Sequence, residues 1–149
     1  MQVSIELSDA AFAPVERAWA IKCAIEGFAL GCLPAFKRWN LPPLYQSGVR
    51  FQLPPEHGSG LERMQTPIDT YHDGVGDCDR LLIWWLCERW AKGLPARCST
   101  IFVGGNMHVL GRKSWTENGP LEDPSVYLGA AVPPGWPPNV PMIRARQLL

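Results

Sequence analysis

Apolar and polar residues alternate in several short stretches of the chain, which is the pattern of half-buried β-strands. Such stretches cover residues 1–7 and 49–53, and the second is followed by two prolines. Two more cover residues 96–103 and 107–113, on either side of Gly104-Gly105-Asn106. Because such residues favour a tight turn, we predict a β-hairpin there and two further short strands.

Longer segments carry apolar residues at the spacing of an α-helix. One covers residues 8–30, where Ser8 or Asp9 can cap the first turn. Another covers residues 78–92 and stops before Gly93, a residue type that commonly ends helices. This second helix is apolar around most of its circumference, so we expect it to lie in the middle of the domain.

Prolines mark the remaining parts of the chain. Residues 32–48 contain three prolines and are predicted to form an irregular connection. Thr66-Pro67 is typical of the start of a short helix, with Thr66 as the cap. Residues 120–129 should be a turn-rich segment. We interpret residues 1–131 as one domain and residues 132–149 as a proline-rich C-terminal tail that extends over the surface.

Charge and length exclude several classes of function. The 149 residues include 14 Lys and Arg against 14 Asp and Glu, a balance that argues against nucleic-acid binding and against a polybasic membrane surface. Residues 1–7 lack the features of a signal peptide. The longest strongly apolar run, residues 81–87, is far too short to span a bilayer. We therefore expect no membrane partner and no secretion by a signal peptide.

Five cysteines stand at positions 23, 32, 78, 87 and 98, without a CxxC pair. An odd number leaves one thiol outside any disulfide framework, and the spacing of a zinc finger is absent. We therefore expect a reducing compartment and free thiols. Cys87 lies about 180° around the helix from Cys78, so Cys87 should face the core, as should Cys98. Cys23 and Cys32 are interpreted as core or connector thiols.

Cys78 stands apart because it begins the buried helix, behind Gly74 and Gly76. The N-terminus of a helix offers unpaired N–H groups and positive potential, which lower the pKa of a thiol and can stabilise an oxyanion. Such a cysteine needs an imidazole partner, which in turn needs an orienting acceptor. His108 on the predicted hairpin and Asp123 after it supply both. His72, close to Cys78 in sequence, is a rival base, whereas His57 is interpreted as an exposed loop residue.

The run from Met64 to Asp79, MQTPIDTYHDGVGDCD, resembles the nucleophile region of transglutaminase-like cysteine proteinases. In that family a T-P segment leads into G-x-G-D-C at the start of the central helix. Residues 93–97, GLPAR, resemble the segment before the family's histidine strand, and residues 122–125, EDPS, resemble its D-P segment. Residues 43–51 resemble small members encoded by phages and prophages. The resemblance covers about residues 43–129.

This resemblance implies a papain-like α+β fold, in which the cysteine helix packs on a small antiparallel sheet. It implies hydrolysis of peptide or amide bonds, or acyl transfer to an amine. By position, Cys78 is the nucleophile, His108 the general base and then acid, and Asp123 the orienting group. The partner would be a protein substrate or a phage structural protein, inside the host bacterium or on the virion. No cofactor is expected, although Asp77 and Asp79 match part of the calcium-binding set of some relatives.

Several residues keep a second interpretation. Cys78 can be a buried structural thiol, His108 an ordinary strand residue, and Asp123 a turn initiator before proline. Asp77 can serve as a helix cap or in the site.

Trp39 and Tyr45 are candidates for lining a substrate cleft or stabilising an oxyanion, while the Trp84-Trp85 pair and Trp90 are assigned to the core. The alternative function is a non-catalytic assembly protein of a phage particle, such as a head–tail junction or tail component. A metal-dependent hydrolase is a distant third, because no paired metal-ligand spacing supports it.

Overall fold

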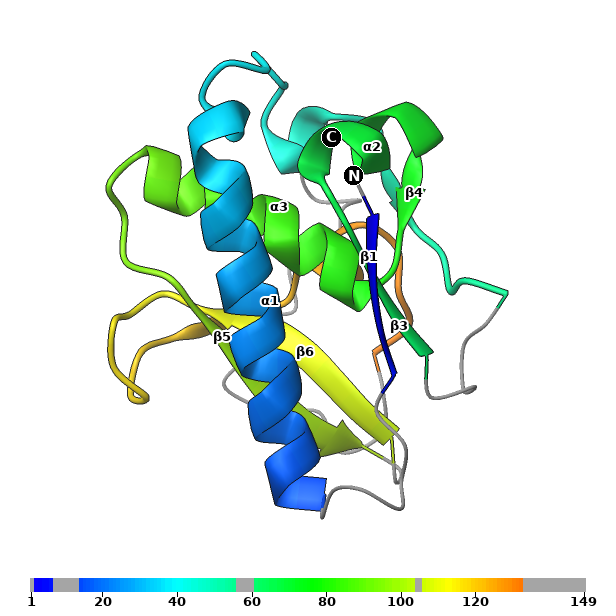
Figure 1. Ribbon diagram of the computed structural model, residues 1–149, viewed down its shortest axis with the longest axis vertical. Coiled ribbons are helices and arrows are strands. Elements are labelled where there is room, and N and C mark those ends of the chain that lie inside the picture. Colours follow the sequence, from blue (N-terminus) through cyan, green and yellow to red (C-terminus); the bar gives the residue numbers. More distant parts are fainter. Residues whose placement is uncertain (1, 7–13, 56–60, 104–105, 133–149) are drawn as a thin grey trace.

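The computed structural model describes residues 2–6, 14–55, 61–103 and 106–132, and it has a mixed α+β architecture (Figure 1). The N-terminal half contains β1 (Gln2–Glu6), α1 (Pro14–Phe36), the short 3-10 helix η1 (Leu44–Gln46), β2 (Arg50–Phe51) and β3 (Leu61–Gln65). Then follow α2 (Pro67–Asp73), β4 (Val75–Gly76), α3 (Cys78–Ala91), β5 (Arg97–Val103), β6 (Asn106–Arg112), β7 (Leu121–Glu122) and α4 (Pro124–Tyr127).

Helix α3 is the centre of the hydrophobic core. Every residue from Leu81 to Cys87 is buried, including both members of the Trp84-Trp85 pair. Helix α1 lies across one side of α3, and the β5–β6 hairpin lies below α3 in Figure 1. The prediction that α3 is a central buried helix is therefore confirmed.

The strands form three small sheets. β5, β6 and β7 make an antiparallel sheet in that order, with Thr100 opposite Val109 and Gly111 opposite Glu122. β1 pairs antiparallel with β3, and β2 pairs parallel with β4. The predicted hairpin and the strands near residues 1–7 and 49–53 are thus confirmed. Figure 1 shows β6 passing beneath α3, the arrangement that brings helix and strand residues together.

Helix α1 differs from the prediction at its C-terminal end. It continues to Phe36 instead of ending near residue 30, and Pro34 lies inside it. The helix tolerates this proline because Ala29 and Cys32 are buried in the core, while Phe36 packs against its edge. Backbone bonds from Lys37 to Leu33 and from Trp39 to Phe36 then close the last turns.

The same helix bears on the expectation that no segment of the chain is long enough to span a bilayer. By length and composition alone, Val15–Phe36 is long and apolar enough to cross a membrane. One such helix is weak evidence, since the core helix of a soluble protein passes the same test. Ile21 and Ile25 of α1 are almost completely buried against the core.

Residues at the start of α2 set its N-terminal boundary, as predicted. Thr66 caps α2 by accepting a hydrogen bond from the Asp69 amide, and Pro67 is its first residue. Residues 120–129 are more regular than predicted, because they hold β7 and α4. Ser8, Asp9, His57 and the tail beyond residue 132 lie outside the described residues.

Candidate active site

Cys78 is the first residue of α3, and the backbone before it is shaped by glycine. Gly74 ends α2 in the left-handed region at φ 73°, a conformation that costs glycine little. At Gly76 an added Cβ would lie 3.1 Å from both Leu81 Cδ2 and Thr70 Cγ2, so the chain passes close to its neighbours. Asp77 then caps α3, since its Oδ1 accepts from the Arg80 amide at 3.1 Å. Of the two interpretations of Asp77, the structure shows the cap.

The Cys78 sulfur lies between α3 and β6. Its Sγ donates a hydrogen bond to Oδ1 of Asp79 at 3.6 Å. From β6, the backbone amide of Val109 hydrogen-bonds the sulfur. Residue 78 itself is half-buried. Helix start and strand are therefore in direct contact at the atom that carries the proposed chemistry.

These surroundings raise the pKa of the Cys78 thiol well above its usual range. Burial is the largest cause, and the charges of Asp79 and Asp77 add to it. The Val109 amide lowers the pKa, but by less. The expectation of a lowered pKa is therefore wrong, because burial and the charges of two adjacent carboxylates outweigh the Val109 amide.

His108 and Asp123, the other two residues of the predicted triad, form a pair. Nε2 of His108, on β6, lies 2.5 Å from Oδ2 of Asp123. Asp123 follows β7 and is 1% exposed, and its Oδ1 accepts from the Ser125 amide at 2.8 Å. The turn interpretation of Asp123 is thus also satisfied, since the same side chain caps α4.

Two interactions link the three residues predicted as a triad: one between His108 and Asp123, and one between Asp123 and Cys78. Val109 bonds the sulfur, the preceding residue His108 bonds Asp123, and the Asp123 charge acts on the Cys78 thiol. The rival base His72 lies exposed on α2, where its ring is 6.0 Å from that of Tyr71. Of the two candidate bases, His108 is therefore the one that has a buried carboxylate partner.

A second acidic residue, Glu122, was missed by sequence reasoning. Its Oε1 accepts from Tyr45 Oη at 2.6 Å and from Trp85 Nε1 at 2.9 Å, and its Oε2 lies 2.5 Å from Lys113 Nζ. Burial raises the pKa of Glu122, but the bonds from Lys113, Tyr45 and Trp85 together lower it below its usual value. The sequence signal that could have pointed to Glu122 was the pair of acidic residues, 122 and 123, directly before a proline.

This network changes the assignment of the two aromatic candidates. The Tyr45 hydroxyl donates its hydrogen bond to Glu122. The Tyr45 ring stacks on that of Tyr127, with the ring centroids 4.5 Å apart. A phenol has one proton to donate, so Tyr45 is a support of the site and not an oxyanion donor. Trp39 packs edge-on against Phe36 at the end of α1.

The other cysteines are separate from this site. Cys32, Cys87 and Cys98 are buried, as expected for the last two and for Cys32 as a core thiol. Cys23 is exposed on α1, so its assignment to the core or a connection is wrong. Within the described part of the chain, no group of three or more His, Cys, Asp or Glu side chains could hold a metal ion. The calcium role of Asp77 and Asp79 stays a prediction without support from this arrangement.

Comparison of the chain with protein-family models, with curated proteins and with solved structures found no match in any of the three. Function is therefore inferred from the residues of the site.

Proposed function

We propose that the chain is a thiol-dependent hydrolase or acyl transferase acting on peptide or amide bonds. One observation carries the proposal: His108, paired with the buried carboxylate of Asp123, directly precedes the residue whose amide bonds the Cys78 sulfur. A nucleophile at a helix start, a base beside it and an acceptor behind the base form the arrangement of nucleophilic catalysis.

The geometry supports distinct roles for the two ring nitrogens of His108. Asp123 engages Nε2, so Nδ1 is the atom that would take the proton of Cys78. The sulfur then attacks the carbonyl carbon, and the oxyanion is stabilised by N–H groups of the first turn of α3. His108 returns the proton to the leaving amine, which departs as the acyl-cysteine forms. Water or a second amine, deprotonated by His108, releases the acyl group and restores the thiol.

The raised pKa of Cys78 determines how this cycle would start. Because burial and two carboxylates favour the neutral thiol, the proton would leave during attack and not before it. His108 would therefore act as a general base in each turnover, a role that typically contributes about 10²–10⁴-fold to the rate.

The architecture agrees with the papain-like, transglutaminase-like core that the motifs suggest. The cysteine begins a central helix, and the histidine lies on an antiparallel sheet packed against that helix. The same resemblance to phage-encoded members makes a protein of a phage particle the proposed substrate.

Alkylation by iodoacetamide tests the proposal without knowledge of the substrate. Peptide mass spectrometry gives the rate at Cys78, with the exposed Cys23 as the internal reference. His108→Ala should slow alkylation of Cys78 by about tenfold or more, since the base is lost, and leave Cys23 unchanged. His72→Ala is the matched control and should alter neither rate. Equal Cys78 rates in the two variants would refute the proposed base.

An activated ester tests the acyl-transfer step itself. Wild-type protein should release p-nitrophenol from p-nitrophenyl acetate through an acyl-cysteine, which mass spectrometry detects on the peptide containing Cys78. Cys78→Ala should lose the release of p-nitrophenol, whereas the control Cys23→Ala should keep it. Acylation at Cys23 alone would contradict the assignment of the nucleophile.

One observation favours a second function, that of a non-catalytic assembly protein on the same fold. The pKa of Cys78 is raised by burial and by both flanking carboxylates, which is the behaviour of an inert thiol. In that case Cys78 would be alkylated no faster in wild type than in His108→Ala, and the ester would leave no acyl group on it.

A further inference from the structure

Strand β7 is only two residues long, and Asp123 lies directly beyond its pairing with β6. The last pair of that register is Gly111 with Glu122, so the sheet holds residue 122 but not residue 123. A strand this short gains little stability from backbone pairing alone. The place of the carboxylate that engages His108 therefore depends on what holds the side chains around it.

The carboxylate of Glu122 connects β7 to distant elements of the fold. Its Oε1 accepts from Trp85 of α3 at 2.9 Å and from Tyr45 of η1 at 2.6 Å. Its Oε2 pairs with Lys113, which follows β6. Glu122 is 7% exposed, and hydrogen bonds to a charged group are stronger than those between neutral groups. One buried side chain thus ties β7 to two elements that precede it in the chain.

Trp85 lies on the same face of α3 as Cys78. Seven residues separate the two, which is two helical turns to within about 20°. The indole packs directly on β6, because a Cβ added at Gly111 would lie 2.5 Å from two of its ring atoms. The missing side chain lets the indole cross β6 and reach Glu122, the residue opposite Gly111 in the sheet. This bond therefore sets the spacing between the cysteine helix and β7.

Tyr45 holds the chain on both sides of Asp123. Its hydroxyl bonds Glu122, and its ring stacks on Tyr127 of α4 with an interplanar angle of 17°. The residues between Glu122 and Tyr127 are buried. A buried segment held at both ends leaves the Asp123 carboxylate little freedom to move.

We propose that Glu122 is a positioning residue, which holds the Asp123 carboxylate on His108. It does so by tying β7 to the cysteine helix and to η1, through Trp85 and Tyr45. Its effect on the reaction rests on the proposed function, whereas its effect on the pair of Asp123 and His108 does not.

Two substitutions at Glu122 separate its acceptor atom from its charge. Glu122→Ala removes every bond of the carboxylate. Glu122→Gln keeps an oxygen that accepts from Trp85 and Tyr45 and loses the ion pair with Lys113, whose side chain is 37% exposed, so that this pair contributes less. Tyr45→Phe removes one bond and keeps the stacked ring, which provides a milder variant if Glu122→Ala fails to fold.

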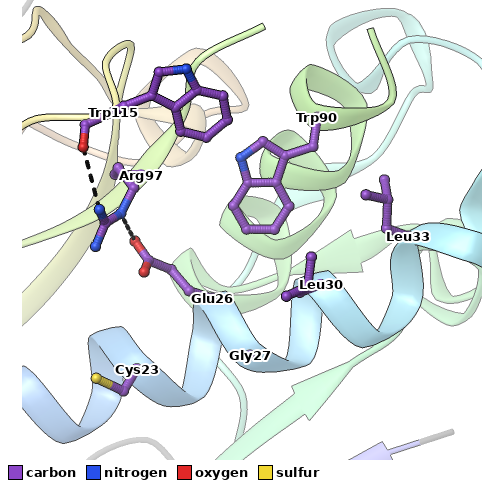
Figure 2. Close-up of a pocket in the computed structure, with 8 residues that line it drawn as sticks. All are labelled: Cys23, Glu26, Gly27, Leu30, Leu33, Trp90, Arg97 and Trp115. Carbon is purple, nitrogen blue, oxygen red and sulfur yellow. Dashed lines mark hydrogen bonds and ion pairs between the residues drawn. The ribbon is translucent and has the colours of Figure 1, made fainter. Parts of the chain in front are cut away.

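Glu26→Ala is the matched control. Oε1 of Glu26 also accepts two bonds, from Arg97 Nε at 2.9 Å and from the Cys98 amide at 2.8 Å. These bonds tie α1 to β5, which is the opposite edge of the sheet from β7. Figure 2 shows Glu26 reaching Arg97 in the groove beside Trp90. The control therefore loosens the fold by a tie of the same kind without touching the segment that holds Asp123.

Proton–carbon NMR of the histidine rings observes the pair without any substrate. The chain has three histidines, and His108→Ala identifies the signals of His108. Asp123→Ala supplies the reference for a ring that has lost its partner. In Glu122→Ala the His108 signals should move at least halfway toward that reference, and in Tyr45→Phe they should move by less. In Glu122→Gln and in Glu26→Ala they should stay at their wild-type positions.

Acylation of Cys78 by p-nitrophenyl acetate measures the consequence for the reaction. Because a displacement of about 1 Å can lower a rate about 100-fold, Glu122→Ala should slow acylation by about 10–100-fold and Glu122→Gln by less than about threefold. Glu26→Ala should acylate at the wild-type rate.

Unmoved His108 signals in Glu122→Ala would overturn the proposal. Equal shifts in Glu122→Ala and Glu26→Ala would overturn it too, since they would reflect a general loosening of the fold. If Glu122→Ala does not fold, unmoved His108 signals in Tyr45→Phe overturn it instead. A wild type that forms no acyl-cysteine would refute the proposed function, and the ring signals would still decide whether Glu122 positions Asp123.

Discussion

Replacement of Gly111 by alanine tests how α3 is seated on β6, and therefore how the candidate nucleophile meets its base. Gly111 is buried on β6, three residues after His108. A Cβ at this position would lie 2.5 Å from Cη2 and Cζ3 of Trp85 and 2.9 Å from Cε3. These distances are far inside van der Waals contact, so the indole or the strand has to move.

The magnitude follows from what holds the indole. Trp85 is 4% exposed, its Nε1 donates to Glu122 at 2.9 Å, and Arg89 lies over its ring at 5.2 Å. Overpacking costs about 1–3 kcal/mol, and a lost bond to a buried acceptor costs about 1–3 kcal/mol more. Alanine restores about 0.5–1 kcal/mol of backbone entropy. We expect a net loss of roughly 2–5 kcal/mol, which lowers Tm by about 4–20 °C at this size.

Urea unfolding followed by tryptophan fluorescence measures this loss, with calorimetry for Tm. Gly31→Ala is the matched control, because Gly31 is in α1 and an added Cβ there meets nothing within 4 Å. It should stabilise the chain by about 0.5–1 kcal/mol, as alanine does in helices. The reasoning is refuted if Gly111→Ala is as stable as wild type, or if the two variants shift stability in the same direction.

Three further predictions follow from individual contacts. Asp79→Asn removes the carboxylate that accepts from the Cys78 thiol, so the thiol pKa should fall and iodoacetamide should label Cys78 faster at pH 7, with Cys23 unchanged. An unaltered ratio of the Cys78 rate to the Cys23 rate would contradict the electrostatic cause. Glu122 has a pKa below the ordinary 4.5, so its stabilisation should be present above pH 4.5 and lost as pH falls through the folded-state pKa. Glu122→Gln should flatten that pH dependence of unfolding, and an unchanged slope would show that another group causes it. Thr66→Ala should cost about 1 kcal/mol in urea unfolding through loss of the α2 cap, whereas Thr66→Ser should cost less than half of this.

Local chemistry predicted the elements whose limits depend on neighbours in sequence. Asp77 caps α3 and Thr66 caps α2 because their oxygens reach amides three residues ahead. Cys78 was placed at a helix start for the same reason. The end of α1 was not predicted, because packing of its last turns against the core outweighs the helix-breaking tendency of Pro34.

By itself, the sequence determined the helix that begins at Cys78, the hairpin that carries His108, and the chain order of the three candidate residues. Tertiary structure decided the burial, the neighbouring charges and the hydrogen-bond partners of those residues. The pKa of Cys78 rises because folding buries the sulfur next to the charges of Asp79 and Asp77. The Glu122 network and the groove beside Trp90 depend on side chains from distant parts of the chain. Hydrogen-bond geometry near one residue is local, whereas burial and long-range charge exist only after the elements have packed.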